Sequence, residues 1–355
     1  MSPATVPKVL YGVSPIGLGH ATRSLVLAEE LERRGAEVRL FSGGKAAEFI
    51  QGSGFRVDDI VEDPVPHVSD GEMTRVALWY VRSWIANRRT IPRTRRLLDA
   101  YSPDLVVCDE EFSGMAVAAE RGVKRVFVAD ELALGFARTW ASRRIETRVD
   151  RWYRGLQDSV DLLIVPEPGE SGGNRRFVGP IVRAITKSPA DSKAFYGLPV
   201  GGMVLFATSG SGLWRELALR VKDAVANAGL AGVSLVMTGN RGPKIRGETV
   251  YDLGVVPDNQ NLVAAADLVV STAGKSTIDE AAAAGTPIIV IPIRHHAEQE
   301  RNAAALGYTS ADVSRLPELV RDMFGKRQPQ RSFNGEVEAS RAILSVGQRS
   351  SATEV

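Results

Sequence analysis

The sequence has very little cysteine and no long hydrophobic run. Cys108 is its single cysteine, so the chain cannot form an internal disulfide, which fits a reducing cytosol. No apolar run approaches the roughly 18 residues that a transmembrane helix needs. Residues 1–7 contain no apolar stretch of the kind found in a signal peptide. We therefore expect a cytoplasmic protein.

Charge of either sign is not in excess either. The 44 Lys and Arg residues nearly balance the 42 Asp and Glu residues, and the net charge of +2 argues against bulk attraction to nucleic acid. Arginine supplies 35 of the basic residues, which permits local recognition of anions. At 355 residues the chain is too long for one ordinary hydrophobic core, so we expect two domains.

Predicted strands and helices alternate along the chain, which predicts an α/β fold with a parallel, doubly wound sheet in each half. A linker is expected between 177 and 199. We predict an N-terminal domain over residues 1–180, a C-terminal domain over 181–330, and a tail over 331–355. The tail has one expected helix, at 336–346, which packs back on the N-terminal domain. Strands are expected at 9–13, 37–41, 56–61, 104–108, 125–128 and 161–165, and then at 203–207, 234–238, 250–253, 268–271 and 288–292.

Three turns of small residues follow predicted strands, at 14–19, 208–212 and 271–276. Two facing doubly wound domains place a cleft at the carboxyl ends of their strands, and helix N-termini in such a cleft bind phosphate oxygens. These turns therefore favour a diphosphate ligand. Alternatively, each turn is only a tight connection between a strand and a helix. None of the three carries the dinucleotide-binding fingerprint or a P-loop.

The stretch 271–302 combines one of these turns with several polar side chains. Gly274 is expected to form the turn, because only glycine adopts any φ without a clash of a Cβ atom. Ser276 or Thr277 can then cap the following helix. Glu280 lies six residues after the glycine, where a carboxylate can accept both hydroxyls of a ribose. The alternative is an ordinary exposed glutamate.

Glu298 and Gln299 are expected in a polar loop after the strand at 288–292. A carboxylate and an amide together can distinguish sugar hydroxyls by their pattern of donors and acceptors. The alternative is the solvated start of a helix.

His20 is expected at the start of the first helix, beside a glycine-rich turn. Its imidazole can act as a general base toward an acceptor hydroxyl if a carboxylate orients it. Asp109, at the end of the strand at 104–108, is expected to lie near enough to do so. The alternative is a histidine that caps the helix or fills the core.

Metal ligands are scarce at useful spacing. The chain has no Asp-x-Asp pair, which weakens any mechanism in which Mg²⁺ binds a diphosphate. His295 and His296 are adjacent, but no third ligand stands at metal spacing. We expect no metal and no cofactor.

Residues 75–98 carry seven arginines and no acidic residue. They fall in a predicted long helix that is interrupted or kinked at Pro92, and aromatic residues are interleaved with the arginines. Such a helix suits an anionic membrane surface or a lipid-linked acceptor. Alternatively, the tryptophans pack inward and the arginines face water. The expected contact residues are Trp79, Trp84, Arg88 and Arg89.

These motifs together resemble those of GT-B glycosyltransferases of the MurG-like kind, glycosyltransferase family 28. The resemblance covers most of residues 8–310 and is strongest in Gly17-Leu-Gly-His20 and in the stretch 271–302. It implies a GT-B fold, with two doubly wound, Rossmann-like domains and the active site in the cleft between them. The N-terminal domain is then the acceptor-binding domain and the C-terminal domain the nucleotide-sugar donor-binding domain. Enzymes of this kind are typically metal-independent.

The resemblance also implies roles for single residues. His20 matches a histidine needed for activity, and Asp109 occupies a place comparable to its aspartate partner in related plant-type transferases. Glu280 matches the ribose-binding glutamate, and Gln299 matches the glutamine that binds the sugar. Arg183, in Gly179-Pro-Ile-Val-Arg183, is then expected to reach the diphosphate.

Two loops complete the implied donor site. The loop 208–212 matches the Gly/Ser loop at the diphosphate, and the loop 254–257 matches the segment whose backbone binds uracil. The predicted donor-binding residues are Gly17, Gly19, Arg183, Ser209, Gly210, Ser211, Val255, Val256, Gly274, Lys275, Ser276, Glu280, Glu298 and Gln299.

The implied reaction is inverting transfer of a hexose or an N-acetylhexosamine from a UDP-sugar to an acceptor hydroxyl. A lipid-linked sugar or glycolipid at the cytoplasmic face of the membrane is the implied acceptor. A UDP-sugar hydrolase of the same fold is the alternative, since it shares the opening Gly-x-Gly-His-x-x-Arg-x-Leu that residues 17–25 fit. A non-catalytic, sugar-nucleotide-binding subunit is a third interpretation.

Overall fold

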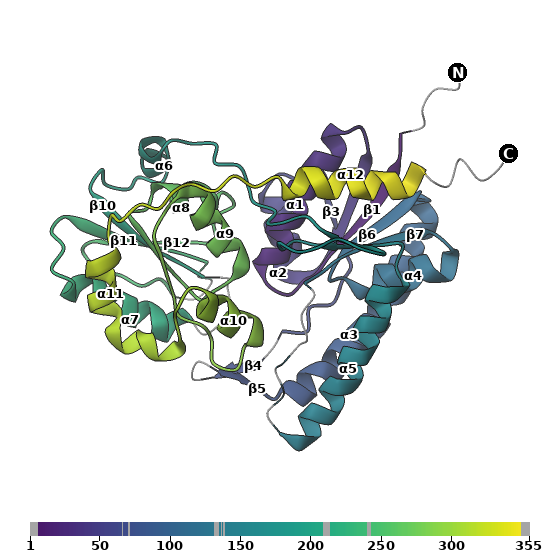
Figure 1. The fold of residues 1–355 in the computed structure, drawn as a ribbon, viewed down its shortest axis with the longest axis horizontal. Coiled ribbons are helices and arrows are strands. Elements are labelled where there is room, and N and C mark those ends of the chain that lie inside the picture. Colours follow the sequence, from purple (N-terminus) through teal and green to yellow (C-terminus); the bar gives the residue numbers. More distant parts are fainter. Residues whose placement is uncertain are drawn as a thin grey trace. The chain divides into compact units, whose positions relative to one another are not determined.

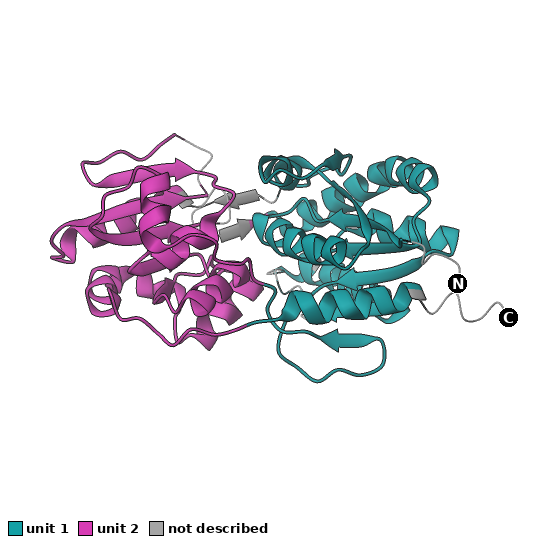
Figure 2. Cartoon of the chain, turned by 90° about the horizontal axis from the view of Figure 1, so that it is seen from above, with its two compact units in different colours: residues 1–66, 75–181, 333–355 teal, residues 67–74, 182–332 magenta. Residues whose placement is uncertain are grey.

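The computed structural model describes residues 6–65, 67–69, 72–130, 135, 137, 139–208, 214–239 and 243–348. The chain divides into two compact units, which Figure 2 colours separately. Unit 1 comprises Met1–Pro66, Arg75–Ile181 and Phe333–Val355, and unit 2 comprises His67–Thr74 and Val182–Ser332. Each unit has its own parallel sheet and its own hydrophobic core.

Unit 1 is built on a seven-stranded sheet in the order β3-β2-β1-β6-β7-β8-β9, and its neighbouring strands are parallel. The strand order reverses between β1 and β6, so the sheet is doubly wound, as predicted. At this reversal Val13 of β1 pairs with Asp109 of β6. The strands are β1 (Lys8–Val13), β2 (Glu37–Ser42), β3 (Val57–Asp59), β6 (Leu105–Asp109), β7 (Lys124–Val128), β8 (Leu162–Val165) and β9 (Arg175–Phe177).

Helices cover the strands of unit 1, and strands that are buried in this way are short apolar runs. All five residues of β6, for example, are buried. Helix α3 runs through Pro92 without a break and packs against α4 and α5 (Figure 1). The tail helix α12 belongs to unit 1 and packs against α1. The helices are α1 (Leu18–Arg33), α2 (Gly44–Gly52), α3 (Val76–Tyr101), α4 (Phe112–Arg121), α5 (Trp140–Ser159) and α12 (Gly335–Gln348).

Unit 2 is built on a five-stranded parallel sheet in the order β12-β11-β10-β13-β14. It is doubly wound as well, with the reversal between β10 and β13. The strands of this sheet are β10 (Gly202–Ala207), β11 (Val233–Thr238), β12 (Val250–Gly254), β13 (Leu268–Ser271) and β14 (Ile288–Val290). A separate antiparallel pair, β4 (His67–Ser69) and β5 (Glu72–Thr74), also belongs to unit 2. The helices are α6 (Pro189–Phe195), α7 (Trp214–Asn227), α8 (Asn259–Ala265), α9 (Lys275–Ala284), α10 (Ala297–Ala305) and α11 (Leu316–Met323), with a 3-10 turn at Ser310–Arg315.

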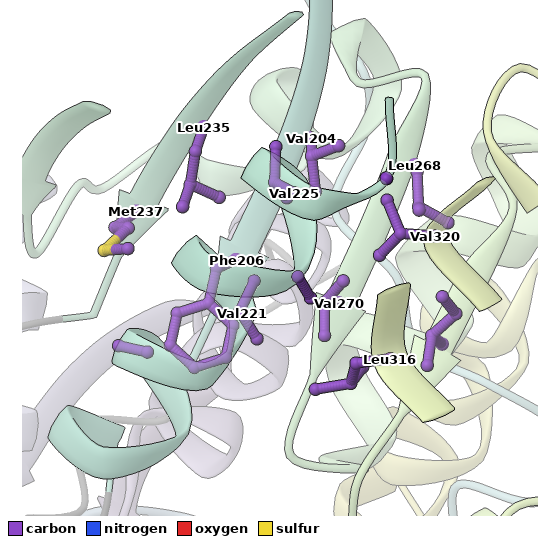
Figure 3. Close-up of a cluster of buried hydrophobic side chains, with 14 of the residues drawn as sticks. Val204, Phe206, Val221, Val225, Leu235, Met237, Leu268, Val270, Leu316 and Val320 are labelled. Atoms are coloured by element: carbon purple, nitrogen blue, oxygen red, sulfur yellow. The ribbon is translucent and has the colours of Figure 1, made fainter. Parts of the chain in front are cut away.

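A hydrophobic cluster fastens helices to the unit 2 sheet. Figure 3 shows side chains of β10, β11 and β13 meeting those of α7 and α11. Its labelled members are Val204, Phe206, Val221, Val225, Leu235, Met237, Leu268, Val270, Leu316 and Val320.

Two local predictions differ from the structure. The expected strand at 56–61 pairs only over Val57–Asp59. The expected linker contains helix α6, whose N-cap Ser188 accepts a hydrogen bond from the backbone N–H of Asp191 at 3.1 Å. The signal was present in the sequence, because serine followed by proline is a common start of a helix.

A third difference concerns Glu298 and Gln299. Both lie in the first turn of α10 rather than in a loop. The helix begins directly after His296, whose side chain caps the N-terminus of α10 by accepting a hydrogen bond from the backbone N–H of Gln299.

Candidate active site

The structure brings His20 and Asp109 together in unit 1. Asp109 is the last residue of β6, and His20 lies in the first turn of α1, which follows β1, the neighbouring strand. Nδ1 of His20 lies 2.8 Å from Oδ1 of Asp109. A carboxylate accepts this bond, so Nδ1 carries the proton and a neutral ring has Nε2 left as an acceptor.

Arg23 contacts the same carboxylate, although it was not among the predicted site residues. It lies one turn after His20 on α1, and its Nε and Nη2 each lie 2.6 Å from an oxygen of Asp109. Ser24 donates a further bond to Asp109 at 3.0 Å, and Nη1 of Arg23 donates to Asp130 at 3.1 Å. Arg23 is the arginine of the Gly-x-Gly-His-x-x-Arg-x-Leu motif at residues 17–25, and this motif could have identified it.

These contacts explain the charge of the carboxylate. Burial raises the pKa of Asp109, but Arg23 and His20 outweigh burial and hold this pKa at about 2. Burial likewise opposes a charged imidazole, yet the carboxylates of Asp109 and Glu110 raise the pKa of His20 to about 9. A pKa of about 9 favours the protonated imidazole at neutral pH, so the ring must lose a proton before Nε2 can act as a base.

Glycine is required at the start of α1. Gly17 is the N-cap, with φ of 76° and ψ of 163°, a conformation that L side chains rarely adopt. Gly19 lies in the first turn, where its carbonyl accepts a bond from Thr22 at 2.8 Å. No acidic residue stands in this turn, so the helix N-terminus can receive an anion.

In unit 2, Arg183 is bound to Glu280. Nε of Arg183 donates to Oε1 of Glu280 at 2.9 Å, and Nη1 donates to the carbonyl of Pro257. Both side chains are nearly buried, at 12% and 5% exposed. The resemblance implied that Arg183 contacts the diphosphate. In this structure its guanidinium instead binds Glu280, the residue expected to bind the ribose. In the loop expected to bind the base, Val256 is buried and Val255 is half-buried.

The expected turn at Gly274 is formed by its neighbour. Gly274 has an ordinary φ of −68°, whereas Ala273 has φ of 62°. Asn302 holds this left-handed residue by donating to the carbonyl of Ala273 at 3.0 Å. The prediction that Gly274 forms the turn was therefore wrong, because the side chain of Asn302 stabilises the reversal one residue earlier, at Ala273.

The predicted cap of α9 was wrong as well. The helix begins at Lys275, so Ser276 and Thr277 lie inside it, and its N-cap Gly274 provides no side chain. Lys275 reaches the carboxylate of Asp279, with its Nζ 2.6 Å from Oδ1. No side-chain cap hydrogen bond is made to the N–H groups of this first turn, and such groups can bind an anion.

Gln299 is held in one orientation. Its side chain is buried, and Oε1 accepts a bond from the backbone N–H of Ile293 at 3.0 Å. With Oε1 bonded to Ile293, the NH2 group of Gln299 remains as its donor. Gln299 does lie at the start of a helix, as the alternative had it, but its side chain is buried rather than solvated. Glu298, the other residue predicted here, is half-buried. Desolvation lowers the pKa of the neighbouring His296 to about 4.

The loop predicted at the diphosphate is only partly described. Ser209, Gly210 and Ser211 lie outside the described residues. Thr208, at the end of β10, donates from its backbone N–H to the carbonyl of Thr238 at 3.3 Å.

The two tryptophans of the arginine-rich helix α3 differ in their surroundings. Trp79 turns inward and donates to the carbonyl of Pro64 at 2.6 Å, whereas Trp84 is 61% exposed. Arg88 lies over the ring of Trp84, 5.2 Å from its centre, and Arg89 is near Glu62 at 3.8 Å. The inward packing considered as the alternative is therefore seen for Trp79, whereas the Trp84 side chain is exposed.

An apolar groove lies beside Trp84 in unit 1. It has a volume of about 260 Å³ and runs between α3, α4 and α5. Trp140 and Trp152 of α5 are also exposed. The apolar residues that line the groove include Trp84, Ile91, Phe112, Met115, Trp152 and Leu156.

Comparison with known proteins establishes the fold and the kind of activity. Residues 237–324 match the glycosyltransferase family 28 C-terminal domain, and residues 19–187 match a glycosyl transferase 4-like domain. The solved structure of the spinosyn rhamnosyltransferase SpnG complexed with thymidine diphosphate is similar, with a TM-score of 0.60 at 15% identity, over 99% of this chain and 100% of that one. The chain is a GT-B glycosyltransferase with a family 28 C-terminal domain.

Proteins with similar sequences are also named as glycosyltransferases. A protein of Methanosarcina acetivorans, named an uncharacterized glycosyltransferase, is 24% identical over 320 residues, or 84% of this chain and 81% of that protein. The UDP-N-acetylglucosamine–N-acetylmuramyl-(pentapeptide) pyrophosphoryl-undecaprenol N-acetylglucosamine transferase of Nocardia farcinica is 27% identical over 365 residues, or 95% of this chain and 91% of that protein. The resemblance to MurG-like transferases is confirmed.

Neither a cluster of metal-ligand side chains nor a membrane-spanning helix occurs among the described residues. No group of three or more His, Cys, Asp or Glu side chains there is placed to hold a metal ion. Among the helices described, none is long and apolar enough to cross a membrane.

Proposed function

We propose that this glycosyltransferase moves a hexose or an N-acetylhexosamine from a UDP-sugar to an acceptor hydroxyl, with inversion at the anomeric carbon. The observation that carries the proposal is the His20–Asp109 hydrogen bond of 2.8 Å, which orients the imidazole and leaves Nε2 for the acceptor. Nε2 takes the proton of the hydroxyl while the oxygen forms its bond to the anomeric carbon. The bond from that carbon to the diphosphate breaks, and its electron pair leaves with the nucleotide.

We propose that unit 2 binds the donor. The uncapped N-terminus of α9 receives phosphate oxygens, and the amide donors of Gln299 bind the sugar. Glu280 exchanges Arg183 for the ribose hydroxyls, which releases the guanidinium toward the diphosphate and stabilises the leaving group. The named donor of the Nocardia farcinica relative, a UDP-sugar, and the thymidine diphosphate bound by SpnG support a pyrimidine nucleotide.

We propose a lipid-linked sugar or glycolipid as the acceptor, at the cytoplasmic face of the membrane. The support is the exposed surface of α3 and α5, where Trp84, Trp140 and Trp152 are 61%, 72% and 50% exposed. Arginines lie over two of these rings: Arg88 over Trp84, and Arg144 over Trp140 at 4.5 Å. Aromatic rings beside cations suit the interface of an anionic bilayer.

The test is a product assay with a panel of UDP-sugars, with and without a polyprenyl-diphosphate-linked sugar. We expect a glycosylated lipid and UDP in equal amounts, formed only when the acceptor is present. Fast, stoichiometric release of free sugar without acceptor would identify a hydrolase instead. The His20→Ala variant should lose about 10²- to 10⁴-fold in kcat, as expected for a lost general base. Asp158→Asn, an exposed change at the end of α5, is the matched control.

A further inference from the structure

Glu110 directly follows Asp109 and has an unusual backbone conformation. Its φ is 45°, in the left-handed region that a glutamate rarely adopts. Its backbone N–H donates to the carbonyl of Val128 at 3.2 Å, and its Oε1 accepts a bond from the hydroxyl of Tyr153 at 3.0 Å. The backbone of Glu110 is therefore held from β7 and its side chain from α5, and such conformations persist only where the surroundings impose them.

This conformation directs the second carboxylate oxygen at the imidazole. Oε2 of Glu110 lies 3.7 Å from Nε2 of His20, the nitrogen that the bond to Asp109 leaves unused. The two carboxylates thus face the two nitrogens of one ring. Both facing side chains are partly exposed, His20 by 21% and Glu110 by 27%, whereas Asp109 is fully buried.

We propose that Glu110 is a positioning residue for His20: its carboxylate stabilises the positive charge that the ring gains when Nε2 takes the proton of the acceptor hydroxyl. The inference rests on the proposed function, in which Nε2 is the base. When the hydroxyl oxygen bonds to the anomeric carbon, its proton forms a new N–H on Nε2. The resulting imidazolium then has a carboxylate beside each N–H, so positive charge that develops in the transition state is stabilised.

The surrounding charges are consistent with this role. Asp109 and Glu110 together raise the pKa of His20 against the opposing effects of burial and Arg23. Burial raises the pKa of Glu110 itself, while His20 lowers it. A base of higher pKa takes a proton more strongly, at the expense of being neutral only at higher pH. The titratable groups around the ring are Asp109 and Glu110 after β6, Arg23 on α1, Asp130 after β7, Tyr153 on α5 and Tyr11 on β1.

The test compares Glu110→Gln with the wild-type protein in two measurements. NMR titration of the His20 ring should show a pKa lower by roughly one unit or more, since an opposite charge near the ring is removed. The pH profile of kcat/KM should change in the same sense: the rise of activity shifts to lower pH by the same amount, and the plateau at high pH falls. Glu110→Asp keeps the charge and should restore most of the wild-type profile.

Two further variants separate this role from a merely structural one. Tyr153→Phe removes the anchor of Glu110 without a change of charge and should shift both quantities in the same direction, by less. Asp158→Asn removes an exposed charge of α5 and should shift neither. A variant that loses rate equally at every pH, or whose His20 pKa is unchanged, overturns the proposal. The NMR titration needs no substrate, so it remains decisive even if the protein transfers no sugar.

Discussion

Asp109 and Arg23 form a buried, two-point ion pair in which Nε lies 2.6 Å from Oδ2 and Nη2 lies 2.6 Å from Oδ1. A buried carboxylate of this kind is stable only with a charged partner and satisfied hydrogen bonds. The pair keeps Asp109 ionised, so it can orient His20 in both protonation states of the ring.

Removing the guanidinium should therefore be costly. We expect Arg23→Met to lower the free energy of unfolding by about 3–5 kcal/mol, because it leaves a buried charge without its main partner. The double variant Arg23→Met/Asp109→Leu should recover part of that loss. Urea unfolding of the three proteins at pH 7 measures both values, and a double variant less stable than the single one contradicts the expectation.

The stability should also depend on pH through the pair His20–Asp109. The pKa of Asp109 is lowered from 3.8 to about 2, so its contribution is present above pH 3.8 and is lost as the pH falls toward 2. The pKa of His20 is raised from 6.5 to about 9, so its contribution is complete below pH 6.5 and is lost as the pH rises toward 9. The two contributions amount to about 2 and about 3 kcal/mol at most.

Urea unfolding from pH 6 to pH 9 of the wild type and of His20→Gln checks this sign. The stability difference between the two proteins should shrink by about 3 kcal/mol over that range. Taking the difference removes the other titrating groups, and a constant difference shows that the two residues are not coupled.

Glu280 should control the binding of the ribose. We expect Glu280→Gln to weaken UDP binding about tenfold or more, because it removes charged hydrogen bonds to two hydroxyls. It should leave the binding of 2′,3′-dideoxy-UDP nearly unchanged, and calorimetry of both ligands measures the effect. Glu216→Gln, exposed on α7, is the matched control. Equal losses for both ligands contradict the ribose contact.

Arg183 offers a complementary experiment at the same ion pair. Arg183→Ala should weaken UDP binding, since the proposed diphosphate contact is lost. Uridine, which has no phosphate, should bind at least as tightly as before, because Glu280 is already released. Weaker binding of uridine would show that Arg183 only supports the pocket.

Gln299 should read the sugar through its amide donors. Gln299→Glu keeps the acceptor for the N–H of Ile293 and loses those donors. We expect unchanged folding and unchanged affinity for UDP, with a reduced kcat/KM for the UDP-sugar. Gln299→Ala removes both groups and should also destabilise by about 1–3 kcal/mol, because a buried N–H is left unpaired. Equal kinetics for Gln299→Glu and the wild type would exclude a sugar contact.

The two tryptophans of α3 should behave differently at a membrane. Trp84→Ala/Arg88→Ala/Arg89→Ala should reduce binding to phosphatidylglycerol vesicles and leave the weak binding to phosphatidylcholine unchanged. Trp79→Phe should bind vesicles as the wild type does, but be less stable by about 1 kcal/mol, since it loses the bond to Pro64. Vesicle sedimentation measures the first effect. Unchanged binding of the triple variant would show that this helix is only structural.

Local patterns in the sequence were enough for most of the architecture. The strands at 9–13 and 104–108 were predictable because a parallel strand buried on both faces is a continuous apolar run. The alternation with amphipathic helices then led to two doubly wound sheets, and the resemblance in the stretch 271–302 led to the glycosyltransferase family.

The errors arose where a distant residue decides a local conformation. Gly274 was expected to form the turn, but Asn302, 29 residues later, stabilises the left-handed Ala273 instead. Trp79 and Trp84 lie five residues apart on one helix and so point to different sides, but the sequence did not show that Trp79 is the one that bonds to the carbonyl of Pro64.

The sequence by itself thus determined the order of the elements, the fold class and the pair His20 and Asp109 as candidates, because local periodicity and short motifs carry that information. Only the tertiary structure decided which charges meet. Arg23 joins Asp109 across 86 residues, and Arg183 joins Glu280 across 97. Contacts over such separations depend on how sheets and loops bring strand ends together, and no local pattern encodes them.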